Sequence, residues 1–400
     1  MGDLKQIHVL GDGVTGQAVK AKVDDLDGYQ LVALEQADLI VASPGIPPHQ
    51  YPKTSAPIIS ELEFAYRLFH RPESSYRPKL ICTTGTNGKT TLTSLLSYAL
   101  EIPAAGNIGT PLICYVDDPE GTDWIAVEAS SYQLYSCDQF RPEIAVMLPI
   151  TDDHLTWHQH FDHYAQSKAK IFSAQTTGDT LIYPEHCPII QHLLPLAKGT
   201  CLPYSPSDPA LDQIQTELQG SHNSLTVLAA TMAVQVSGQL SDTIQKRLSE
   251  FKALPHRLEK IYEANGVRVY NDSKATNPDS TIKAIESFST PIRLILCGDD
   301  KGLDYSQFMA FLHDHVIEIV VFGGLSDKIL TTSKLNREAF PCTVVESIDA
   351  AVKHCLSNAN SGDIILFSPS SSSFDLFKSY IDRGDAFKTS VQTFIASEHA

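Results

Sequence analysis

The stretch TTGTNGKTT (residues 83–91) carries the residue types that bind phosphate. It follows a short apolar run and precedes a helical pattern, so backbone N–H groups at the start of that helix could surround an anion. Lys89 would add a mobile positive charge, and the Thr90 hydroxyl could bind Mg²⁺. The phosphate-loop pattern G-x-x-x-x-G-K-[ST] has a glycine where this chain has Thr83. The sequence therefore predicts a nucleotide site with one unexplained position, the alternative being a structural strand-to-helix turn.

Two further polar residues follow apolar runs. Glu128 ends the run WIAVE, and His154 comes after MLPITDD. Because the carboxyl ends of neighbouring parallel strands meet at one edge of a sheet, both side chains would reach the phosphate loop. Glu128 could then complete the coordination of an Mg²⁺ ion bound by Thr90, directly or through water. The alternative for Glu128 is a solvated strand end.

Four histidines lie close together in DDHLTWHQHFDHYAQSK (residues 152–168), at positions 154, 158, 160 and 163. Their spacings match none of the compact zinc patterns, and phosphate chemistry favours Mg²⁺ with oxygen ligands. We therefore expect most of these histidines to be surface or helix-capping residues.

A second glycine pattern lies near the amino terminus. Gly11, Gly13 and Gly16 form G-x-G-x-x-G directly after the apolar run QIHVL. Read alone, this pattern predicts a dinucleotide site for NAD or FAD. A single fingerprint of this kind is a weak signal.

These residues need a scaffold that presents strand ends side by side. Apolar runs alternate with helical patterns along the chain, which predicts an α/β protein with mainly parallel sheets. The Pro-containing stretches HRPESSYRPK (70–79) and FKALPHR (251–257) indicate two boundaries. We predict a small Rossmann-like domain at 1–76, a central phosphate-loop-type domain at 77–252 and a Rossmann-like α/β domain at 253–400.

Composition excludes several classes of protein. The 400 residues are 42% hydrophobic, and their formal net charge of −17 argues against general nucleic-acid binding. No apolar run approaches the roughly 18 residues of a membrane span, so we expect no membrane insertion. The start MGDLKQIHVL does not resemble a secretory signal. Eight cysteines without C-x-x-C pairs indicate reduced thiols in a cytoplasmic protein.

A series of motifs in this order resembles the Mur ligase family, the ATP-dependent amide-forming enzymes of peptidoglycan precursor synthesis. Members carry T-G-T-N-G-K-[ST] as their phosphate loop, so the resemblance implies that Thr83 is expected there. The motifs are TGTNGKT (84–90), GNIG (106–109), EASSYQL (128–134), TDDH (151–154), YAQSK (164–168), HN (222–223), LPHRLE (254–259) and GDDK (298–301).

Two stretches narrow the resemblance to one branch. NDSKATNPDST (271–281) and SPSSSSFDLFKSYIDRGDAF (368–387) are similar to the branch that adds D-glutamate, whereas other family ligases carry D-Y-A-H at the place of NDSK. The implied reaction joins D-glutamate to UDP-N-acetylmuramoyl-L-alanine through an acyl phosphate, with ATP cleaved to ADP and phosphate. The resemblance also implies a cytoplasmic monomer with a role in cell shape and division.

The resemblance also implies roles for individual residues, with ATP and two Mg²⁺ ions as cofactors. The implied catalytic residues are Lys89, Glu128, His154, Lys168 and Arg257, and the implied metal ligands are Thr90, Glu128, His154 and Lys168, the last as a carbamate. The implied ATP-binding residues are Gly85, Thr86, Asn87, Gly88, Lys89, Thr90, Thr91, Asn223, Arg257, Asn271, Lys274 and Asp299. Without the resemblance, the better interpretation of Lys168 is an exposed lysine on an amphipathic helix.

For the other substrates, the resemblance assigns the amino-terminal glycine pattern to the UDP diphosphate. The implied contacts to the UDP substrate are Gly13, Val14, Thr15, Asn107, Ser130 and His154. The implied contacts to D-glutamate are Lys301, Ser373, Phe374 and Tyr380. The alternative interpretation of SPSSSS is a flexible serine-rich loop.

Three other functions stay open at this point. A phosphate-loop regulator without ligase chemistry is the binding-class alternative, and the Lys168 and Arg257 motifs argue against it. A folylpolyglutamate synthetase-like ligase is the second alternative, which the amino-terminal glycine pattern disfavours. A nicotinamide-dependent oxidoreductase is the third.

Overall fold

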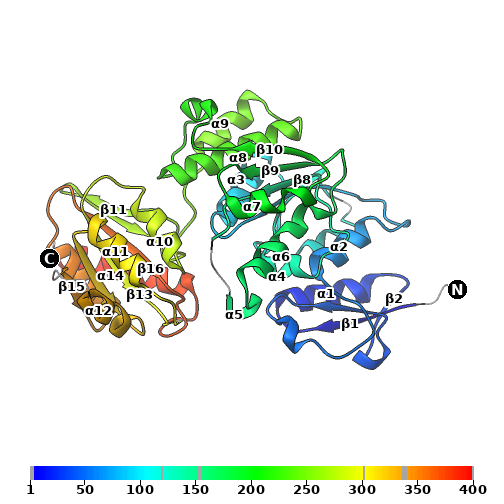
Figure 1. The fold of residues 1–400 in the computed structure, drawn as a ribbon, viewed down its shortest axis with the longest axis horizontal. Helices are drawn as coiled ribbons and strands as arrows, with labels where there is room; N and C mark the ends of the chain where they lie inside the picture. Colours follow the sequence, from blue (N-terminus) through cyan, green and yellow to red (C-terminus); the bar gives the residue numbers. More distant parts are fainter. Residues whose placement is uncertain (1–3, 119, 152–154, 301, 336–339, 399–400) are drawn as a thin grey trace. The chain divides into compact units, whose positions relative to one another are not determined.

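A computed structural model describes residues 4–118, 120–151, 155–300, 302–335 and 340–398 (Figure 1). The chain divides into two compact units. The amino-terminal unit comprises Met1–Thr216 and Asn223–Phe251, and the carboxy-terminal unit comprises Glu217–His222 and Lys252–Ala400.

The amino-terminal unit begins with a small sheet in the order β2-β1-β3-β4, whose strand pairs are all parallel. The chain leaves β1 for β2 on one side, and β3 lies on the other side, so a crevice is expected at the carboxyl ends of β1 and β3. The elements are β1 (Lys5–Leu10), α1 (Val14–Asp25), β2 (Tyr29–Leu31), β3 (Leu39–Ala42), β4 (Ile58–Ser60) and α2 (Glu61–Phe69).

The second sheet of this unit has six strands in the order β10-β9-β8-β5-β7-β6, again all parallel. Its inner strands are buried on both faces, which explains their near-continuous apolar runs. The strands are β5 (Lys79–Thr84), β6 (Ala104–Gly106), β7 (Trp124–Glu128), β8 (Ile144–Met147), β9 (Thr180–Pro184) and β10 (Thr200–Tyr204). The helices are α3 (Lys89–Leu100), α4 (Ser131–Tyr135), α5 (Leu155–His158), α6 (Phe161–Ser173), α7 (Pro188–Leu193), α8 (Ser221–Val236) and α9 (Asp242–Glu250), with short 3-10 helices η3 (Leu112–Tyr115) and η4 (Leu194–Leu196).

The two sheets of the amino-terminal unit share one hydrophobic cluster. It includes Ile7 of β1, Leu62 and Phe69 of α2, Cys82 of β5 and Phe172 of α6. Helix α2 therefore packs into the same core as the strand that leads into the phosphate loop.

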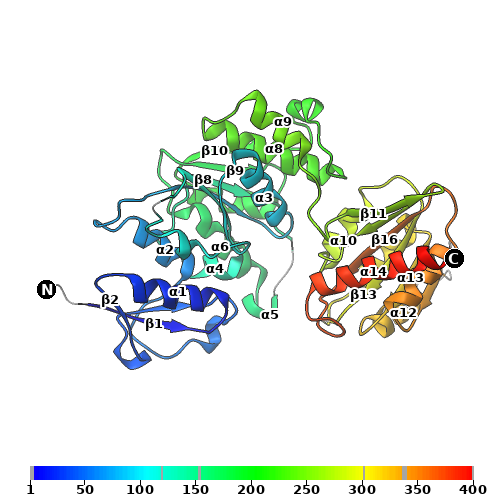
Figure 2. The ribbon, with the colours of Figure 1, turned by 180° about the vertical axis from the view of Figure 1, so that it is seen from behind.

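The carboxy-terminal unit is a three-layer α/β/α sandwich around a sheet in the order β11-β12-β16-β13-β14-β15. Only the β11–β12 pair is antiparallel among the described strands. In β13, Leu294 and Leu296 face the cluster with α10, α11 and α12, whereas Ile295 and Cys297 face the cluster with α13 and α14, as the period of two requires. Helices α13 and α14 lie side by side on their face of the sheet (Figure 2). The elements are β11 (Glu259–Ala264), β12 (Val267–Asn271), α10 (Pro278–Ile285), β13 (Ile292–Cys297), α11 (Ser306–His315), β14 (Glu318–Phe322), α12 (Ser326–Leu335), β15 (Cys342–Val344), α13 (Ile348–Ser357), β16 (Ile364–Ser370) and α14 (Tyr380–Glu398).

The predicted fold class, α/β with mainly parallel sheets, is confirmed. The predicted three-domain boundaries at residues 76 and 252 stay a prediction. Within the described residues, no helix combines the length and the apolar character that crossing a membrane demands.

Candidate active site

The phosphate loop lies between β5 and α3. Thr83 is not in the loop: it is a buried residue of β5, paired with Glu128 of β7 and Val146 of β8. An extended residue between two strands has no need of a glycine. The glycines that the turn does need are Gly85 and Gly88, with φ angles of +150° and +83°. A Cβ on Gly85 would come within 2.5 Å of the Leu148 Cβ. The missing first glycine is thus explained by the strand that precedes the loop.

Backbone and side-chain hydrogen bonds fix the loop. Lys89 Nζ donates to the carbonyl oxygens of Gly85 at 2.9 Å and Thr86 at 2.7 Å. The Thr86 hydroxyl donates to the Thr151 carbonyl at 3.0 Å, and the Thr86 N–H donates to the Pro149 carbonyl at 3.0 Å. The Lys89 ammonium is therefore held at the loop that leads into α3, beside the N–H groups of the first turn of that helix. This is the arrangement that an anionic phosphate needs.

Glu128 lies beside this loop and is buried, so the alternative of a solvated strand end is wrong. Its Oε1 accepts a hydrogen bond of 2.7 Å from Asn107 Nδ2, and its Oε2 has no hydrogen-bond partner among the described residues. A buried carboxylate oxygen without a donor fits a cation site. The described residues form no cluster of three or more His, Cys, Asp or Glu side chains around a metal position. The chemistry of the Glu128 carboxylate, with one buried oxygen lacking a donor among the described residues, therefore fits a cation with oxygen ligands such as Mg²⁺.

Ser130 lies two residues after Glu128 and caps the start of α4. Its hydroxyl accepts from the Gln133 N–H, and the Gln133 side chain accepts from the Ser130 N–H, which makes a complete capping box. Because the helix has only five residues, this cap decides where α4 begins. The predicted contacts Asn107 and Ser130 thus both lie near Glu128, Asn107 through its hydrogen bond and Ser130 two residues further along the chain.

Lys168 of α6 is 1% exposed, so the alternative of an exposed surface lysine is wrong. Its Nζ donates to the Gly85 carbonyl at 2.7 Å and lies 4.5 Å from the centroid of the Tyr164 ring. Tyr164 in turn hydrogen-bonds through its hydroxyl to the Thr86 hydroxyl at 3.1 Å. Helix α6 therefore brings Lys168 and Tyr164 to the phosphate loop.

The histidines differ in their surroundings. His158 is 2% exposed and is an exception to the expectation that most of these histidines are surface or capping residues. His160 is exposed and precedes α6 directly, without a side-chain cap. His158 was missed because its burial depends on packing between α4 and α6, which periodicity in the sequence does not reveal. His154, a predicted catalytic and metal-binding residue, lies outside the described residues.

The amino-terminal glycine pattern lies at the carboxyl ends of β1 and β3. A Cβ on Gly16 would come 2.0 Å from the Gly11 carbonyl oxygen, whereas a Cβ on Gly13 would meet nothing within 4 Å. Val14 begins α1 and is 75% exposed. Ser43, which follows β3, has a buried hydroxyl without a hydrogen-bond partner among the described residues. Gly13, Val14 and Thr15 thus form an open turn at a helix start, where an anion can approach.

Helix α8 also approaches the phosphate loop. A Cβ on Gly88 would lie 3.9 Å from the Thr226 hydroxyl. Asn223 precedes Thr226 by three residues on the same helix, which places it on the same helical face.

In the carboxy-terminal unit, the predicted residues follow the parallel strands β12, β13 and β16. Asn271 is buried at the end of β12, and its Nδ2 lies 3.0 Å from His256 Nδ1 and donates to the Gly384 carbonyl at 3.1 Å. Lys274 Nζ lies 4.0 Å from the centroid of the Tyr380 ring. Burial raises the pKa of Asp272 to about 7, and hydrogen bonds from Ser368 and Leu258 offset part of this rise. The charge of Arg257, in the turn before β11, lowers the same pKa by a smaller amount.

The serine-rich loop is packed rather than flexible. Ser368 Oγ donates to Asp272 Oδ2 at 2.8 Å, and the Asp299 N–H donates to the Ser372 carbonyl at 3.0 Å. Ser373 is buried, whereas Phe374 is 74% exposed and offers an aromatic face. Lys301, a predicted D-glutamate contact, lies outside the described residues.

Arg383 was quoted in a motif but given no role by the sequence. It is fully buried and donates to the Ser273 hydroxyl at 3.0 Å, the Ser273 carbonyl at 2.7 Å and the Ser371 carbonyl at 2.9 Å. It therefore holds the segment after β12 against the segment after β16.

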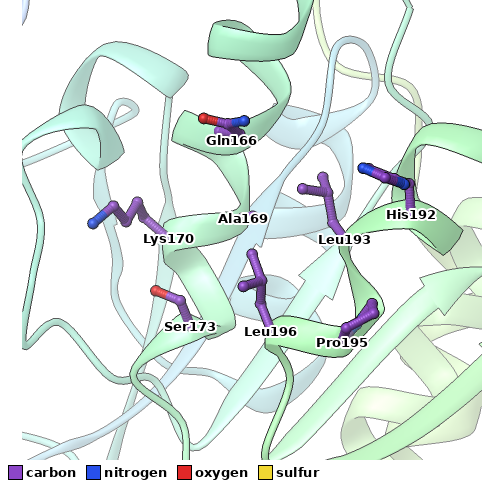
Figure 3. A pocket seen from close by; sticks show the side chains of 8 residues that line it. All are labelled: Gln166, Ala169, Lys170, Ser173, His192, Leu193, Pro195 and Leu196. Atoms are coloured by element: carbon purple, nitrogen blue, oxygen red, sulfur yellow. The ribbon is translucent and has the colours of Figure 1, made fainter.

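A groove of about 480 Å³ lies on another face of α6 (Figure 3). Its lining includes Gln166, Ala169 and Lys170 of α6. Leu193 and Leu196 line it from the other side, and their side chains point toward α6 (Figure 3). None of the predicted site residues lines this groove.

Comparisons with known proteins agree with this geometry. The Mur ligase middle domain matches residues 83–241, and the Mur ligase, glutamate ligase domain matches residues 256–371. The UDP-N-acetylmuramoylalanine–D-glutamate ligase of Acidobacterium capsulatum is 35% identical over 97% of this chain and 89% of the relative. The ligase of the same name from Thermoanaerobacter sp. is 34% identical over 90% of this chain and 85% of the relative.

Solved structures show the same fold. The MurF ligase from Thermotoga maritima, in complex with ADP, has a TM-score of 0.64 at 15% identity and covers 98% of this chain and 96% of its own. The folylpolyglutamate synthase of Mycobacterium tuberculosis, also with ADP, has a TM-score of 0.62 at 14% identity, covering 82% of this chain and 94% of its own.

The parallel sheets and the phosphate loop between β5 and α3 define the class: an α/β protein of the phosphate-loop type, with a separate α/β/α unit at its carboxy-terminal end. The chain belongs to the Mur ligase family. The curated relatives described above carry the name of the D-glutamate-adding branch, so the predicted resemblance is confirmed.

Proposed function

We propose that the chain is an ATP-dependent ligase that adds D-glutamate to UDP-N-acetylmuramoyl-L-alanine in peptidoglycan precursor synthesis. The observation that carries this proposal is the convergence of Lys89, Lys168 and Glu128 on one phosphate loop in a chain whose relatives bear that name. ADP in the solved MurF ligase supports ATP as the nucleotide.

The reaction has two steps. A substrate carboxylate is a poor electrophile because its leaving group would be oxide. Its oxygen therefore attacks the γ-phosphorus of ATP, the bond to ADP breaks, and an acyl phosphate forms. The D-glutamate amine then attacks the acyl carbon, loses a proton and expels phosphate, which leaves the amide. Both steps depend on positioning and on neutralising negative charge.

The phosphate loop supplies the positioning for the first step. The N–H groups at the start of α3 and the Lys89 ammonium would bind the terminal phosphates, with Gly85, Thr86, Asn87, Gly88, Thr90 and Thr91 forming the cradle. Asn223 on α8 would contact the nucleotide from the other side of Gly88. Arg257, Asn271, Lys274 and Asp299 of the carboxy-terminal unit would contribute to the same ATP molecule.

Two Mg²⁺ ions are proposed as cofactors. Thr90 and Glu128 would hold one ion, since Glu128 Oε2 is buried without a hydrogen-bond donor among the described residues. His154 and a carbamate on Lys168 would hold the other. When bound, Mg²⁺ would neutralise charge on the phosphate and carboxylate oxygens. As a free amine, Lys168 donates to the Gly85 carbonyl, and carbamylation would replace this donor by an anion.

The remaining substrates have proposed sites of their own. The UDP diphosphate would lie at Gly13, Val14 and Thr15, and the sugar would lie near Asn107 and Ser130. D-glutamate would be bound by Lys301 and Ser373 through its carboxylates, with Phe374 and Tyr380 as an aromatic wall. We propose a monomer in the cytoplasm, where eight cysteines without C-x-x-C pairs would stay reduced.

The test is phosphate release from ATP and Mg²⁺ with UDP-N-acetylmuramoyl-L-alanine and one acceptor: D-glutamate, L-glutamate, L-lysine or meso-diaminopimelate. We expect release only when the UDP substrate and D-glutamate are both present. Release with a different acceptor would assign another branch of the family. Binding of ATP without release for any acceptor would favour a nucleotide-binding regulator.

A further inference from the structure

His158 lies inside an aromatic cluster between α4 and α6. Its Nε2 forms a hydrogen bond of 2.9 Å with the Ser131 hydroxyl, and its Nδ1 lies 3.1 Å from His163 Nδ1. The ring stacks on Tyr132 at 5.6 Å between centroids and at an angle of 15°. An imidazole in this position has little rotational freedom, because polar partners at both nitrogens and a stacked ring fix its plane.

On one side, His158 touches the residues that support the phosphate loop. Its ring meets the Tyr164 ring edge to face at 5.2 Å. The Tyr164 hydroxyl bonds to Thr86 in the loop, and Thr86 also accepts a hydrogen bond of 2.9 Å from the Thr151 N–H. A shift of the imidazole would therefore be felt at Thr86 through one aromatic side chain.

On the other side, His158 reaches the start of α4. Ser131 is buried and is the first residue of this helix, directly after the Ser130 cap. Glu128 lies two residues before that cap, and Asn107 is bonded to Glu128. The hydrogen bond between His158 and Ser131 thus fixes the strand-to-helix turn that carries Glu128 and Ser130.

We propose that His158 is a positioning residue that sets the start of α4 through Ser131 and thereby places Ser130 for the UDP-sugar substrate. The role of Ser130 in this sentence rests on the proposed function. In this proposal His158 acts through Ser131 and needs no contact of its own with the substrate or the nucleotide.

Two conservative variants separate this role from simple packing. A glutamine amide reaches approximately the position of the imidazole Nε2, whereas the shorter asparagine amide reaches approximately that of Nδ1. His158→Gln therefore keeps a hydrogen-bonding group toward Ser131, and His158→Asn keeps one toward His163. A packing role would make both variants similarly defective, since each replaces the stacked ring by an amide.

The kinetic test is a double-mutant cycle between His158→Asn and Ser131→Ala. We expect each single variant to raise KM for the UDP substrate by about tenfold, the effect of one buried hydrogen bond, with KM for ATP changed less than about threefold. The double variant should be no worse than either single variant, and His158→Gln should recover most of the loss. His160→Gln, at an exposed position of the same segment, is the matched control. Additive losses, or equal losses for Gln and Asn, would overturn the proposal.

A second readout does not require catalysis. Amide hydrogen exchange at residues 130–134 of the ligand-free chain should be faster in His158→Asn and Ser131→Ala than in the wild type and in His158→Gln. Unchanged exchange in His158→Asn would overturn the positioning role even if the wild type were active. Conversely, faster exchange in a chain without D-glutamate-dependent activity would contradict the proposed function and leave the link between His158 and Ser131 standing.

Discussion

At the scale of single residues, the buried carboxyl group of Glu61 makes the free energy of unfolding depend on pH. Glu61 begins α2, and its Oε1 accepts the Ile113 N–H at 2.6 Å, while its Oε2 has no hydrogen-bond partner among the described residues. Burial raises the pKa of Glu61 from 4.5 to about 7, and the N–H groups of Ile113 and Leu112 offset part of that effect. Between pH 4.5 and about pH 7, the folded chain therefore keeps a proton on Glu61 that the unfolded chain releases.

The sign of the resulting pH dependence follows from this direction. Because the folded pKa is the higher one, the stabilising contribution is complete below the unfolded pKa of 4.5 and is lost as pH rises through about 7. We expect Glu61→Gln to remove a decline in the free energy of unfolding of about 2–3 kcal/mol across this window. Thermal unfolding between pH 5 and pH 8 measures this decline. Midpoints that change with pH in the same way in the wild type and in Glu61→Gln would contradict the prediction.

Asp272 provides an internal comparison in the carboxy-terminal unit. Its pKa is also raised by burial, from 3.8 to about 7. Asp272→Asn should therefore flatten a second part of the same decline, so Glu61→Gln alone should leave some pH dependence behind.

At the scale of elements, the turn between β1 and α1 contains one glycine that packing requires and one that packing does not require. A Cβ at position 16 would run into the Gly11 carbonyl oxygen, whereas a Cβ at position 13 would find open space, and Gly13 has a φ of −69° that any residue adopts. We expect Gly16→Ala to lower the unfolding midpoint markedly, because the helix start would have to move away from β1. Gly13→Ala should leave the midpoint unchanged.

The same pair tests the proposed UDP site. If the UDP diphosphate approaches the backbone at residue 13, Gly13→Ala should weaken binding of UDP-N-acetylmuramoyl-L-alanine in calorimetry while the fold stays intact. A variant that binds as tightly as the wild type would place the diphosphate elsewhere.

Glu63 of α2 joins this helix to the loop after α4. Its buried carboxylate accepts hydrogen bonds from the N–H groups of Asp138, Gln139 and Phe140, and it is paired with Arg67 at 2.7 Å. Glu63→Ala would leave these N–H groups without their acceptor, so we expect a loss of about 3 kcal/mol in the free energy of unfolding. Chemical denaturation measures the loss, and Arg67→Ala, which removes only the partner whose side chain is 31% exposed, should cost clearly less. Equal losses for the two variants would contradict this account.

The sequence predicted the elements whose signals are local. The glycines and Lys89 between β5 and α3 fix a turn and a helix start within a few residues, and the buried runs of β13, β14 and β16 are continuous. It could not predict features that depend on packing between distant segments. The burial of His158 depends on the packing of α4 against α6. The buried ammonium of Lys168 depends on the Gly85 carbonyl as its acceptor. The acceptor role of Glu63 depends on N–H groups that begin 75 residues further along the chain.

Thr83 shows the limit of pattern matching in the opposite direction. The phosphate-loop pattern treats its first position as part of the loop, but here that position is an extended residue paired to strands on both sides. Only the family resemblance explained Thr83 from sequence, and the strand register gives the physical reason.

At the scale of the whole molecule, the proposed reaction requires residues from two units with separate cores to act on one ATP molecule. Lys89 and Lys168 belong to the amino-terminal unit, and Arg257 and Lys274 belong to the carboxy-terminal unit. All four are proposed to act around the same ATP molecule, whose terminal phosphate is a few ångströms across. Binding must therefore favour one relative placement of the units, and that preference is a difference in binding energy between placements.

We expect the radius of gyration to fall when a non-hydrolysable ATP analogue and UDP-N-acetylmuramoyl-L-alanine are both bound, as measured by small-angle X-ray scattering. Lys89→Ala is the control: without the ammonium group at the loop, the analogue should bind weakly and the radius should stay at its ligand-free value. An unchanged radius in the wild type, with both ligands shown by calorimetry to be bound, would contradict this requirement. Arg257 and Lys274 would then need roles away from the phosphate, since two side chains in a separate unit cannot neutralise a charge that they do not approach.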